Sequence, residues 1–463
     1  MSARTPFEVP GPTTHLCGGI DQRYLIVPEF MLESGHVLVN VPVAFKTWGQ
    51  LNSTRDNVLL VCHPISGSAD VADWWGPLFG PGHMLDPERY FIVCCNTIGS
   101  PYGTASPLTR RGGEQVQADG SWACAPHVRS PSEPTHWGAD FPNSTVRDDV
   151  RLHKLVLDYL GVEQLAVVLG GSMGGMASLE WPLCFPVRNP RSENHLAAAK
   201  PGEKPYVRST VLLATAARHS GWCIAWSETQ RTMIQGDARF HGGHYRLLDQ
   251  PASGLSAARM CALMTYRQPE SFERRFSRMR GKQNVQQAQQ RADPQTQASS
   301  IMEEGEDTLD ESVGNIRDAQ EREQYAVQSY LKHHGNKFVQ RFDALCYIHL
   351  THKLDSHDIA RERASWVTGS AQVLSPGDEE VLAGVLHKLG TSPVAPRVLV
   401  LSVTSDMLYT PQEQLYIHHN TPRSQFVFIE SSEGHDGFLL EYPQIERAML
   451  AFRGAVEAGF ATL

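Results

Sequence analysis

A serine flanked by glycines is the residue of this sequence best suited to chemistry. Gly170-Gly171-Ser172-Met173-Gly174 follows an apolar run that ends at Leu169, and it precedes a segment of helical character, Ala177–Leu183. A G-x-S-x-G pattern between a strand and a helix is typical of a tight turn that exposes the serine hydroxyl as a nucleophile. Both flanks need glycine because side chains there would clash. The pentapeptide alone is equally compatible with a glycine-rich turn that carries an incidental serine.

A serine hydroxyl needs a base, and an acid and a histidine follow in the order that such a turn requires. Asp406 comes just after the apolar run Arg397–Val403, and His435 follows the next run, Gln425–Glu430. In this arrangement the histidine removes the serine proton and the carboxylate orients the imidazole. Any one of the 20 histidines could be structural. The three residues in this order nevertheless predict a catalytic triad of Ser172, Asp406 and His435.

Two backbone N–H groups are predicted to stabilise the negative oxygen of a tetrahedral intermediate. Met173 begins the helix after Ser172, so its N–H and the helix dipole point toward the reacting atoms. The second amide should come from a small-residue loop after an early strand, and His63–Asp70 is such a loop. We assign this second donor to Ile65.

These residues require a scaffold of parallel strands to hold them. Short apolar runs bounded by turn residues alternate with segments of helical character, which is typical of a mostly parallel sheet with helices on both faces. A strand pair near Val37–Trp48 is expected to form an antiparallel edge. The runs predicted as strands are Val58–His63, Tyr90–Asn96, Gln164–Leu169, Ser209–Ala214, Arg397–Val403 and Gln425–Glu430.

A helical insertion is predicted to interrupt the sheet domain. The insertion carries Trp, Leu and Met at mixed spacing, except for a stretch rich in Gln, Glu, Asp and Ser that has too little apolar area to fold by itself. The predicted units are an N-terminal segment (1–34), an α/β core in two parts (35–217 and 344–463), a helical cap (218–343) with a disordered loop (281–323), and a surface insertion (189–205).

Composition and charge argue against several other classes of protein. Of the 463 residues, 41% are hydrophobic, which is enough to bury a large core. The formal charge of −9 and the lack of a basic block argue against nucleic-acid binding. No apolar run approaches the roughly 18 residues of a membrane span, and the start of the chain lacks a signal core, so we expect a cytoplasmic protein without membrane contact. The nine cysteines include no C-x-x-C, and no metal site is expected.

Distinctive motifs are spread over most of the chain. They are Phe45–Gly49, Cys62-His63, Ser68–Pro77, Ser100–Gly103, Thr145–Val150, Gly170–Trp181, Arg218–Glu228, Gly254–Arg259, Thr265–Arg267, Ser329–Leu331, Arg341–Ala344 and Gly434–Asp436. Together these motifs resemble one family of the α/β-hydrolase superfamily, the homoserine O-acetyltransferases, especially the fungal enzymes of methionine synthesis. The resemblance implies an α/β-hydrolase fold with an inserted cap, and it agrees with the triad and oxyanion donors derived above.

The resemblance also implies a pair of substrates and the residues that hold the acceptor. In this family a cap arginine and the aspartate after the catalytic histidine bind the amino acid, and they match Arg259 and Asp436, while Tyr266 matches a further pocket residue. A guanidinium can grip a carboxylate through two hydrogen bonds, and a carboxylate can pair with an ammonium group. The implied reaction is ping-pong transfer from acetyl-CoA, a co-substrate, to L-homoserine, with no permanently bound cofactor. Family members are typically dimers joined through the cap, so a homodimer is expected.

Other enzymes share the same core residues. A serine O-acetyltransferase, an acetyltransferase for a cephalosporin alcohol or an enzyme that uses succinyl-CoA would differ in pocket length, which the sequence does not define. An esterase or lipase would keep the triad without requiring the arginine and the aspartate of the acceptor site. The motifs SADVADWWGPL and RHSGWCIAWSE favour homoserine. The pairs Trp74-Trp75 and Trp222/Trp226 are interpreted as core residues without a role in the site.

Overall fold

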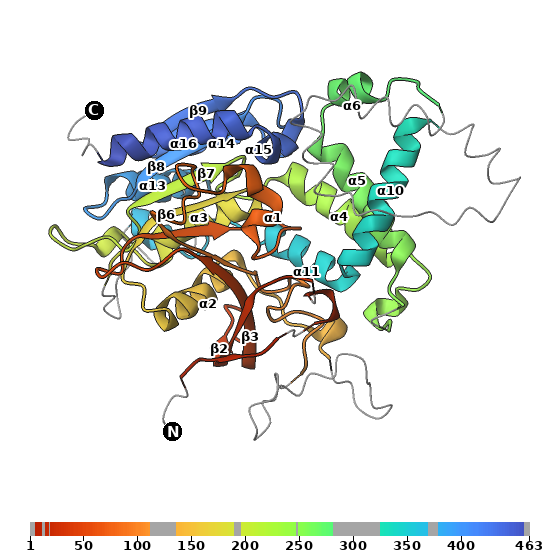
Figure 1. Ribbon diagram of the computed structural model, residues 1–463, viewed down its shortest axis with the longest axis horizontal. Coiled ribbons are helices and arrows are strands. Elements are labelled where there is room, and N and C mark those ends of the chain that lie inside the picture. Colours follow the sequence, from red (N-terminus) through yellow and green to blue (C-terminus); the bar gives the residue numbers. More distant parts are fainter. Residues whose placement is uncertain are drawn as a thin grey trace, which may run out of the picture.

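A nine-stranded sheet is the framework of the molecule (Figure 1). The computed structural model describes residues 5–11, 14–17, 19–111, 136–188, 196–246, 249–280, 325–368 and 378–457. The strands lie in the order β1-β2-β3-β5-β4-β6-β7-β8-β9. Their bounds are β1 Phe7–Val9, β2 Arg23–Met31, β3 Val37–Trp48, β4 Val58–Cys62, β5 Phe91–Cys95, β6 Leu165–Gly171, β7 Ser209–Leu213, β8 Arg397–Val403 and β9 Gln425–Ile429.

The parallel part of the sheet confirms the sequence prediction. Strands β5, β4, β6, β7, β8 and β9 pair in parallel with their neighbours, and they coincide within two residues with the six predicted runs. An α/β-hydrolase fold with a mostly parallel sheet was expected, and this topology agrees with it. The carboxyl ends of these strands therefore meet at one edge of the sheet, where ligands of open α/β sheets bind.

The antiparallel edge differs from the prediction. The segment Val37–Trp48 is one long strand, β3, rather than a pair, and its partners β2 and β1 lie within the predicted N-terminal segment 1–34. Pro28 lies within the β2 sequence, and proline disfavours the interior of a strand. The structure accommodates this proline because β1 pairs with β2 only at Tyr24–Ile26, so Pro28 lies beyond that pairing.

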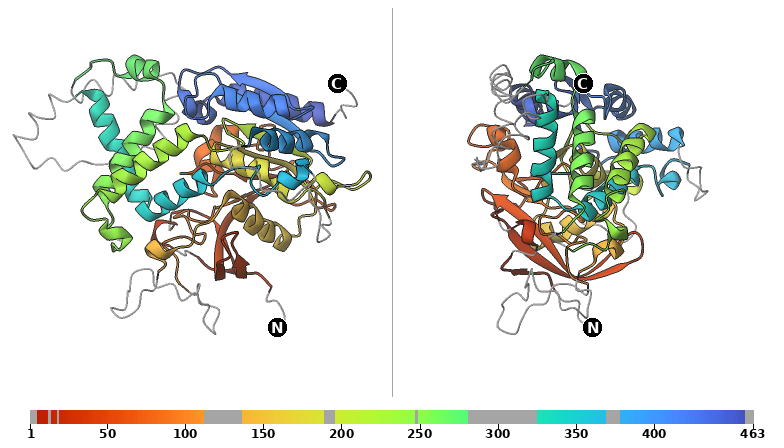
Figure 2. Two further views of the ribbon diagram at one scale, coloured as in Figure 1. Left: turned by 180° about the vertical axis from the view of Figure 1, so that it is seen from behind. Right: turned by 90° about the vertical axis from the view of Figure 1, so that its right-hand side faces the viewer.

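Helices cover both faces of the sheet (Figures 1 and 2). Helices α2, α3, α13 and α14 pack on one face, whereas α1 and α16 pack on the other. The helices are α1 Val71–Trp75, α2 Val146–Tyr159, α3 Met173–Cys184, α4 Gly221–Gln235, α5 Ala252–Tyr266, α6 Pro269–Arg275, α10 Ala326–Arg341, α11 Ala344–Asp355, α12 Ala364–Thr368, α13 Glu379–Thr391, α14 Pro411–Asn420, α15 Gly437–Leu440 and α16 Tyr442–Glu457. None of the helices in the described ranges has the length and apolar character needed to cross a membrane.

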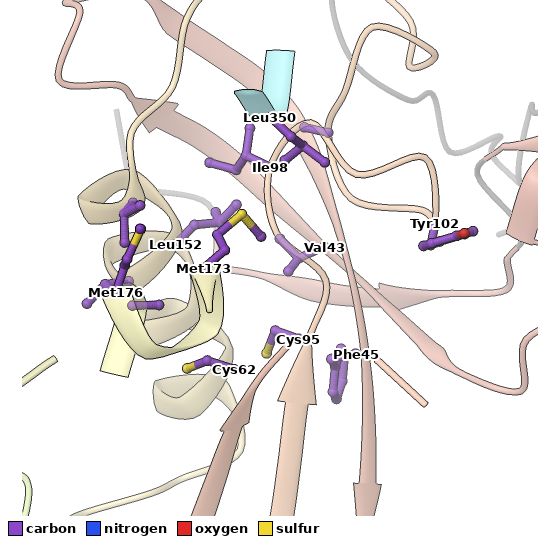
Figure 3. Packing of buried hydrophobic residues seen from close by; sticks show 14 of the residues in the cluster. Val43, Phe45, Cys62, Cys95, Ile98, Tyr102, Leu152, Met173, Met176 and Leu350 are labelled. Atoms are coloured by element: carbon purple, nitrogen blue, oxygen red, sulfur yellow. The ribbon is translucent and has the colours of Figure 1, made fainter. Parts of the chain in front are cut away.

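Alternation along the buried strands explains the two layers of helices. In β4 the side chains of Leu60 and Cys62 belong to the core beneath α2 and α3, while Leu59 and Val61 belong to the core beneath α1 and α16. Successive side chains of a strand point to opposite faces, so a strand buried on both sides must be apolar throughout. Met173 and Met176 of α3 belong to the same buried cluster as Cys62 of β4 (Figure 3), which ties the start of that helix to the sheet.

Helices α4, α5, α6 and α10 lie together beside the sheet, at the right of Figure 1. Helix α5 packs against both α4 and α10, so the two described parts of the predicted cap form one helical unit. The predicted disordered loop 281–323 lies outside the described residues, as do residues 189–195 of the predicted surface insertion.

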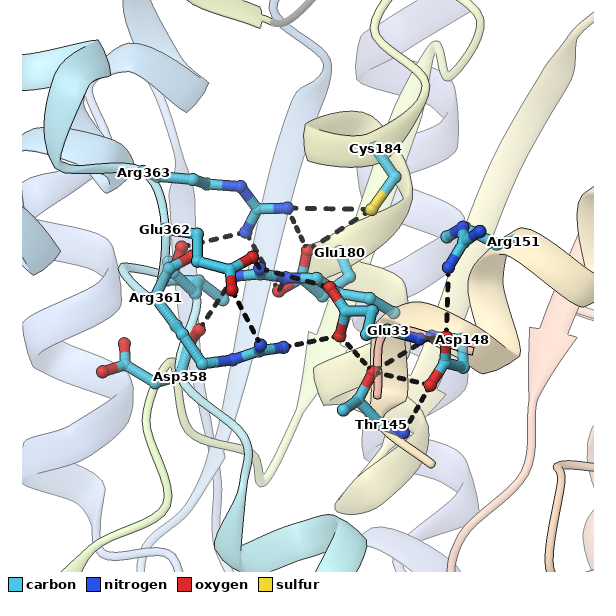
Figure 4. Close-up of polar contacts among 12 residues, drawn as sticks. Glu33, Thr145, Asp148, Arg151, Glu180, Cys184, Asp358, Arg361, Glu362 and Arg363 are labelled. Carbon is cyan, nitrogen blue, oxygen red and sulfur yellow. Dashed lines mark hydrogen bonds and ion pairs between the residues drawn. The ribbon is translucent and has the colours of Figure 1, made fainter. Parts of the chain in front are cut away.

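A buried charge network fixes helix α3, which follows the glycine-flanked serine (Figure 4). The carboxylate of Glu180 accepts hydrogen bonds from Nε of Arg147 at 3.1 Å and from Nη1 of Arg363 at 3.0 Å. Burial would raise the pKa of Glu180, but the charges of Arg363 and Arg147 lower it to about 2. Arg147 also donates to the carbonyl oxygens of Asp358 and Arg361. The network therefore joins α3 to α2 and to the segment before α12.

Five buried histidines have lowered pKa values, and this makes stability depend on pH. Burial lowers the pKa of His63, His153 and His357 to about 4 and that of His219 to about 3, and it lowers the pKa of His349 well below its ordinary value. The ordinary pKa of histidine is about 6.5. Below that pH these histidines bind protons in the unfolded chain but stay neutral in the folded chain. The folded state consequently loses stability as the pH falls from about 6.5 toward 4.

We expect each of these histidines to remove about 1 kcal/mol from the free energy of unfolding between pH 6.5 and 5.5. Thermal unfolding followed by circular dichroism at several pH values measures the effect. His357→Gln should flatten this pH dependence, because it removes one titrating imidazole, whereas His387→Gln on the exposed face of α13 should leave it unchanged. A melting temperature that stays constant from pH 7.5 to 5.5 would contradict the prediction.

Candidate active site

Ser172 lies on a sharp turn between β6 and α3. Its backbone has φ 57° and ψ −125°, a conformation that costs a side-chain-bearing residue about 1–3 kcal/mol. The turn is tight enough that only glycine fits beside it. A Cβ on Gly174 would lie 2.0 Å from the carbonyl oxygen of Cys62, and a Cβ on Gly170 would lie 2.4 Å from the backbone of Gly174. The glycines of the sequence pattern therefore stand where the backbone requires them.

Neighbouring strand ends hold this turn in place. The N–H of Ser172 donates to the carbonyl oxygen of Leu213 at 3.0 Å. The hydroxyl of Thr215, just beyond β7, donates to the carbonyl oxygen of Ser172 at 2.7 Å. Both polar groups of the strained peptide are thus satisfied, which stabilises the conformation that exposes the hydroxyl.

The predicted acid and base are paired. Nδ1 of His435 lies 2.7 Å from Oδ2 of Asp406, and both residues are buried. The other carboxylate oxygen, Oδ1, accepts the N–H groups of Leu408 at 2.8 Å and Tyr409 at 3.0 Å. Asp406 is therefore fixed by the loop after β8, and it holds Nδ1 of His435 so that Nε2 is the nitrogen available for chemistry.

Aromatic rings enclose the imidazole of His435. The ring centroids of Phe438, Tyr409 and Tyr266 lie 5.0, 5.3 and 5.9 Å from it. These rings come from α15, the loop after β8 and the end of α5. They restrict the rotation of the imidazole and reduce the access of water to it.

One cavity of about 90 Å³ collects most of the predicted site residues. Its lining includes Ile65, Ser172, Arg259, Tyr266, His435 and Asp436. Asp406 lies behind His435, and the side chain of Met173 is buried in the core (Figure 3). Residues that are far apart in the chain thus converge where the carboxyl ends of the parallel strands meet the cap.

The two predicted oxyanion donors follow the ends of the neighbouring strands β4 and β6. Neither the N–H of Ile65 nor that of Met173 donates a hydrogen bond to another residue of the described chain. The loop before Ile65 is rigid, because His63 contacts the carbonyl oxygen of Pro64 through Nδ1 at 2.8 Å and accepts the N–H of Thr97 on Nε2 at 3.0 Å. Two fixed amides without a partner in the described residues are suited to binding a developing negative charge.

The three predicted acceptor residues line the same cavity, and Arg259 contacts Tyr266 while Asp436 pairs with a different arginine. The guanidinium of Arg259 lies over the ring of Tyr266 at 5.7 Å and over that of Phe338 at 4.9 Å. Asp436 is paired with Arg267, whose Nε lies 3.0 Å from Oδ2 of the carboxylate. Arg267 was part of a recognised motif but received no role from the sequence, and its pairing with Asp436 is visible only in three dimensions.

The far wall of the cavity was not identified from the sequence. Helix α4 contributes Trp226 and Gln230, and α11 contributes Tyr347 and Thr351. The hydroxyl of Tyr347 donates to Oε1 of Gln230 at 2.6 Å. The prediction that both tryptophan pairs are core residues was wrong for Trp226, which lines the cavity. The i, i+4 spacing of Trp222 and Trp226 shows that they share a helix face, but it does not show whether that face packs against the core or borders a cavity.

For the other three tryptophans, the prediction that they are core residues is correct only in part. Trp75 is fully buried in the core, but its neighbour Trp74 lines a second cavity. Trp222 is 52% exposed. Within the described ranges no cluster of three His, Cys, Asp or Glu side chains could hold a metal ion.

Comparison with a family model and comparison with individual proteins agree with each other. Residues 57–442 match the model of the alpha/beta hydrolase fold. The chain is 41% identical to a homoserine O-acetyltransferase of Saccharomyces cerevisiae, over 93% of this chain and 86% of the relative. It is 40% identical to a homoserine O-acetyltransferase of Schizosaccharomyces pombe, over 94% of this chain and 86% of that protein.

Solved structures show the fold but not the substrate. The homoserine O-acetyltransferase of Bacillus anthracis superposes with a TM-score of 0.65 at 18% identity, covering 93% of this chain and 97% of its own. The crystal structure of esterase E22 gives the same TM-score of 0.65 at 19% identity, covering 93% and 99%. The sequence relatives therefore decide the family: the chain belongs to the homoserine O-acetyltransferases, within the α/β-hydrolase fold.

Proposed function

We propose that the protein transfers an acetyl group from acetyl-CoA to the hydroxyl of L-homoserine. The observation that carries this proposal is the single buried cavity in which Ser172 and the Asp406-paired His435 face Arg259. The first pair suits acyl transfer, and a buried guanidinium suits the carboxylate of an amino acid. Membership of the family supports both assignments.

In the first half-reaction His435 takes the proton of Ser172 on Nε2, and the serine oxygen attacks the thioester carbonyl. The N–H groups of Ile65 and Met173 stabilise the resulting oxyanion. The intermediate collapses as the carbon–sulfur bond breaks, and His435 returns its proton to the departing thiolate. CoA leaves, and Ser172 carries the acetyl group as an ester.

In the second half-reaction the homoserine hydroxyl takes the place of the thiol. His435 removes its proton, the alcohol oxygen attacks the acetyl carbonyl, and the same two amides stabilise the second oxyanion. The bond to Ser172 breaks, His435 protonates the serine oxygen, and O-acetyl-L-homoserine leaves. The protein itself supplies every group that moves a proton in this cycle.

Selection of the acceptor depends on charge. Arg259 binds the α-carboxylate, and Asp436, already oriented by Arg267 at 3.0 Å, binds the α-ammonium group. Water and simple alcohols lack these charges and gain nothing from either residue. An esterase for neutral substrates would have no use for a buried arginine, whose desolvation is costly, so the cavity favours an amino-acid acceptor over simple hydrolysis.

We also propose a homodimer joined through the cap. An apolar hollow on the cap is lined by Trp222, Met264, Phe272, Phe276 and Met407. Trp222, Met264 and Met407 are each more than half exposed, and exposed apolar patches of this kind mark interaction sites.

A cytoplasmic location is proposed as well, supported by the seven described cysteines, all of which are free thiols.

The acetyl-serine intermediate gives the first test. Mixed with acetyl-CoA alone, the wild-type protein should gain the mass of one acetyl group on the peptide that contains Ser172, and Ser172→Ala should not. Because the serine oxygen is the only acyl carrier in the cycle, the variant should lose about three orders of magnitude or more in rate. Normal turnover by the alanine variant in an assay of thiol release would end the proposal.

Arg259→Ala should separate the acceptor site from the acyl-transfer machinery. We expect kcat/KM for homoserine to fall by about a hundredfold, because a buried charged hydrogen bond is lost, while hydrolysis of a small activated acetyl ester continues. Homoserine, serine and water are compared as acceptors in the same assay. Equal turnover of homoserine by variant and wild type would contradict the acceptor role, and preference for serine would identify the alternative acceptor.

The dimer is tested by light scattering at several protein concentrations. Met264→Asp, on the apolar hollow, should shift the protein toward monomers, because it buries a charge at the interface. Met31→Asp is a matched control, since Met31 is 57% exposed on β2 and far from the cap. A wild-type protein that is monomeric at all concentrations would refute the interface.

A further inference from the structure

A second cavity of about 160 Å³ adjoins the catalytic one. The two cavities share Pro64, Ser66, Arg259, Asp436 and Leu439 in their linings, so only these side chains and their neighbours lie between them. Helices α1, α5, α6, α10 and α15 form the walls of the second cavity. We call it the arginine cavity, because four arginines line it: Arg259, Arg267, Arg275 and Arg341.

The arginine cavity carries a positive charge in a protein whose formal charge is −9. Its acidic lining residues are Asp73 and Asp436. Asp436 is already paired with Arg267, and Arg267 is further paired with Glu433. These pairs account for one of the four arginines, and our proposed acceptor carboxylate accounts for Arg259. Two cations, Arg275 and Arg341, remain without an ion pair in the part of the chain that the structure describes, and the one remaining carboxylate of the lining, Asp73, interacts electrostatically with Arg341.

Arg275 is the most unusual of these residues. It is only 8% exposed, and its guanidinium lies 5.6 Å from the ring centroids of both Phe276 and Tyr330. No carboxylate of the described chain lies within ion-pair distance of it. Burial, followed by the like charge of Arg267, lowers the pKa of Arg275. Aromatic faces thus hold the side chain in place while its hydrogen-bond donors stay available to the cavity.

Arg341 approaches the same cavity from the end of α10. It is half-buried, and its guanidinium lies over the ring of Phe338 at 5.7 Å. It likewise makes no ion pair with a carboxylate in the described ranges. Two arginines from different helices, each positioned by an aromatic ring, therefore face one space. A buried cation without a direct ion pair, such as Arg275, is costly, and an anion bound between the two arginines would reduce this cost.

The proposed co-substrate supplies such an anion at the required place. Acetyl-CoA carries its acetyl group at one end of a long flexible arm and its phosphates at the other end. The acetyl end must reach Ser172, so the phosphates must lie in a separate space that is continuous with the catalytic cavity. Guanidinium groups bind phosphate through two parallel hydrogen bonds. Homoserine has a single carboxylate and cannot satisfy three arginines.

Building on the proposed function, we propose that the arginine cavity admits the acyl donor and that Arg275 and Arg341 bind its phosphate groups. The site would recognise the phosphorylated end of an acyl thioester rather than the acyl group. Affinity for the donor is then screened by salt, while the chemistry at Ser172 is unaffected.

The test compares two donors that share the same thioester, acetyl-CoA and acetylpantetheine, which has no phosphate. In Arg275→Gln the KM for acetyl-CoA should rise about tenfold, because a charged hydrogen bond is lost, and Arg341→Gln should act in the same direction. The KM for homoserine and the turnover of acetylpantetheine should stay at wild-type values. Arg275→Lys should recover part of the affinity for acetyl-CoA, since it restores the charge.

Arg274→Gln is the matched control. Arg274 is the neighbouring residue on α6, its side chain is 56% exposed, and it pairs with Glu433 outside the cavity lining. Its substitution should leave both KM values unchanged. If Arg275→Gln instead raises the KM for homoserine and not that for acetyl-CoA, the arginine belongs to the acceptor site and our inference is wrong.

Calorimetry with CoA alone separates this inference from the proposed function. CoA should bind the wild-type protein more tightly than Arg275→Gln, and a rise in ionic strength should weaken the wild-type binding more. Equal affinities in folded protein would overturn the phosphate site. A wild-type protein that acetylates no homoserine would refute the proposed function, and the CoA titration would still decide the site.

Discussion

The geometry of the active site depends on the backbone of one residue, Ser172, held at φ 57° between β6 and α3. A strained peptide persists only where its surroundings over-determine it. Here the surroundings come from distant parts of the chain: the Cys62 carbonyl beside Gly174 and the hydroxyl of Thr215. The turn can therefore form only once β4, β6 and β7 are assembled, so the reactive serine is a product of the complete sheet rather than of its local sequence.

The parallel sheet also brings together, along one edge, residues that are far apart in the sequence. Ile65, Ser172, Asp406 and His435 follow β4, β6, β8 and β9, whose carboxyl ends lie along one edge of the sheet. Strands of a sheet are about 4.8 Å apart, so side chains just beyond neighbouring strands are within reach of a small substrate. Helix α3 adds its dipole at the same place, and its Glu180 is fixed by two buried arginines, so the dipole cannot move relative to the sheet.

An element could be predicted where residues close together in the sequence determine it, and was missed where contacts between distant segments determine it. The parallel strands could be predicted because burial on both faces demands continuous apolar runs. The convergence of Ser172 with the pair of Asp406 and His435 could be predicted because each residue follows such a run, while their catalytic roles stay predictions. Strand β2 was missed because Pro28 is a strong local signal against a strand, and only the short pairing with β1 makes it acceptable. The cap wall of the cavity was missed for a different reason. Residues such as Gln230 and Tyr347 lie on helices whose mutual packing is set by tertiary contacts.

Our proposals divide substrate selection and chemistry between cap and core. The chain superposes equally well on an esterase and on a homoserine O-acetyltransferase, with a TM-score of 0.65 over 93% of its length in each case, so the fold alone does not determine what is acylated. In our proposals, the charges that distinguish an amino acid and a phosphorylated thioester from a neutral ester come from the cap, through Arg259 on α5, Arg275 on α6 and Arg341 on α10. Such a positive cap would let a protein of net negative charge attract the phosphates of the acyl donor and the carboxylate of the acceptor, because the field inside a partly closed cavity is set by the nearest groups rather than by the total charge.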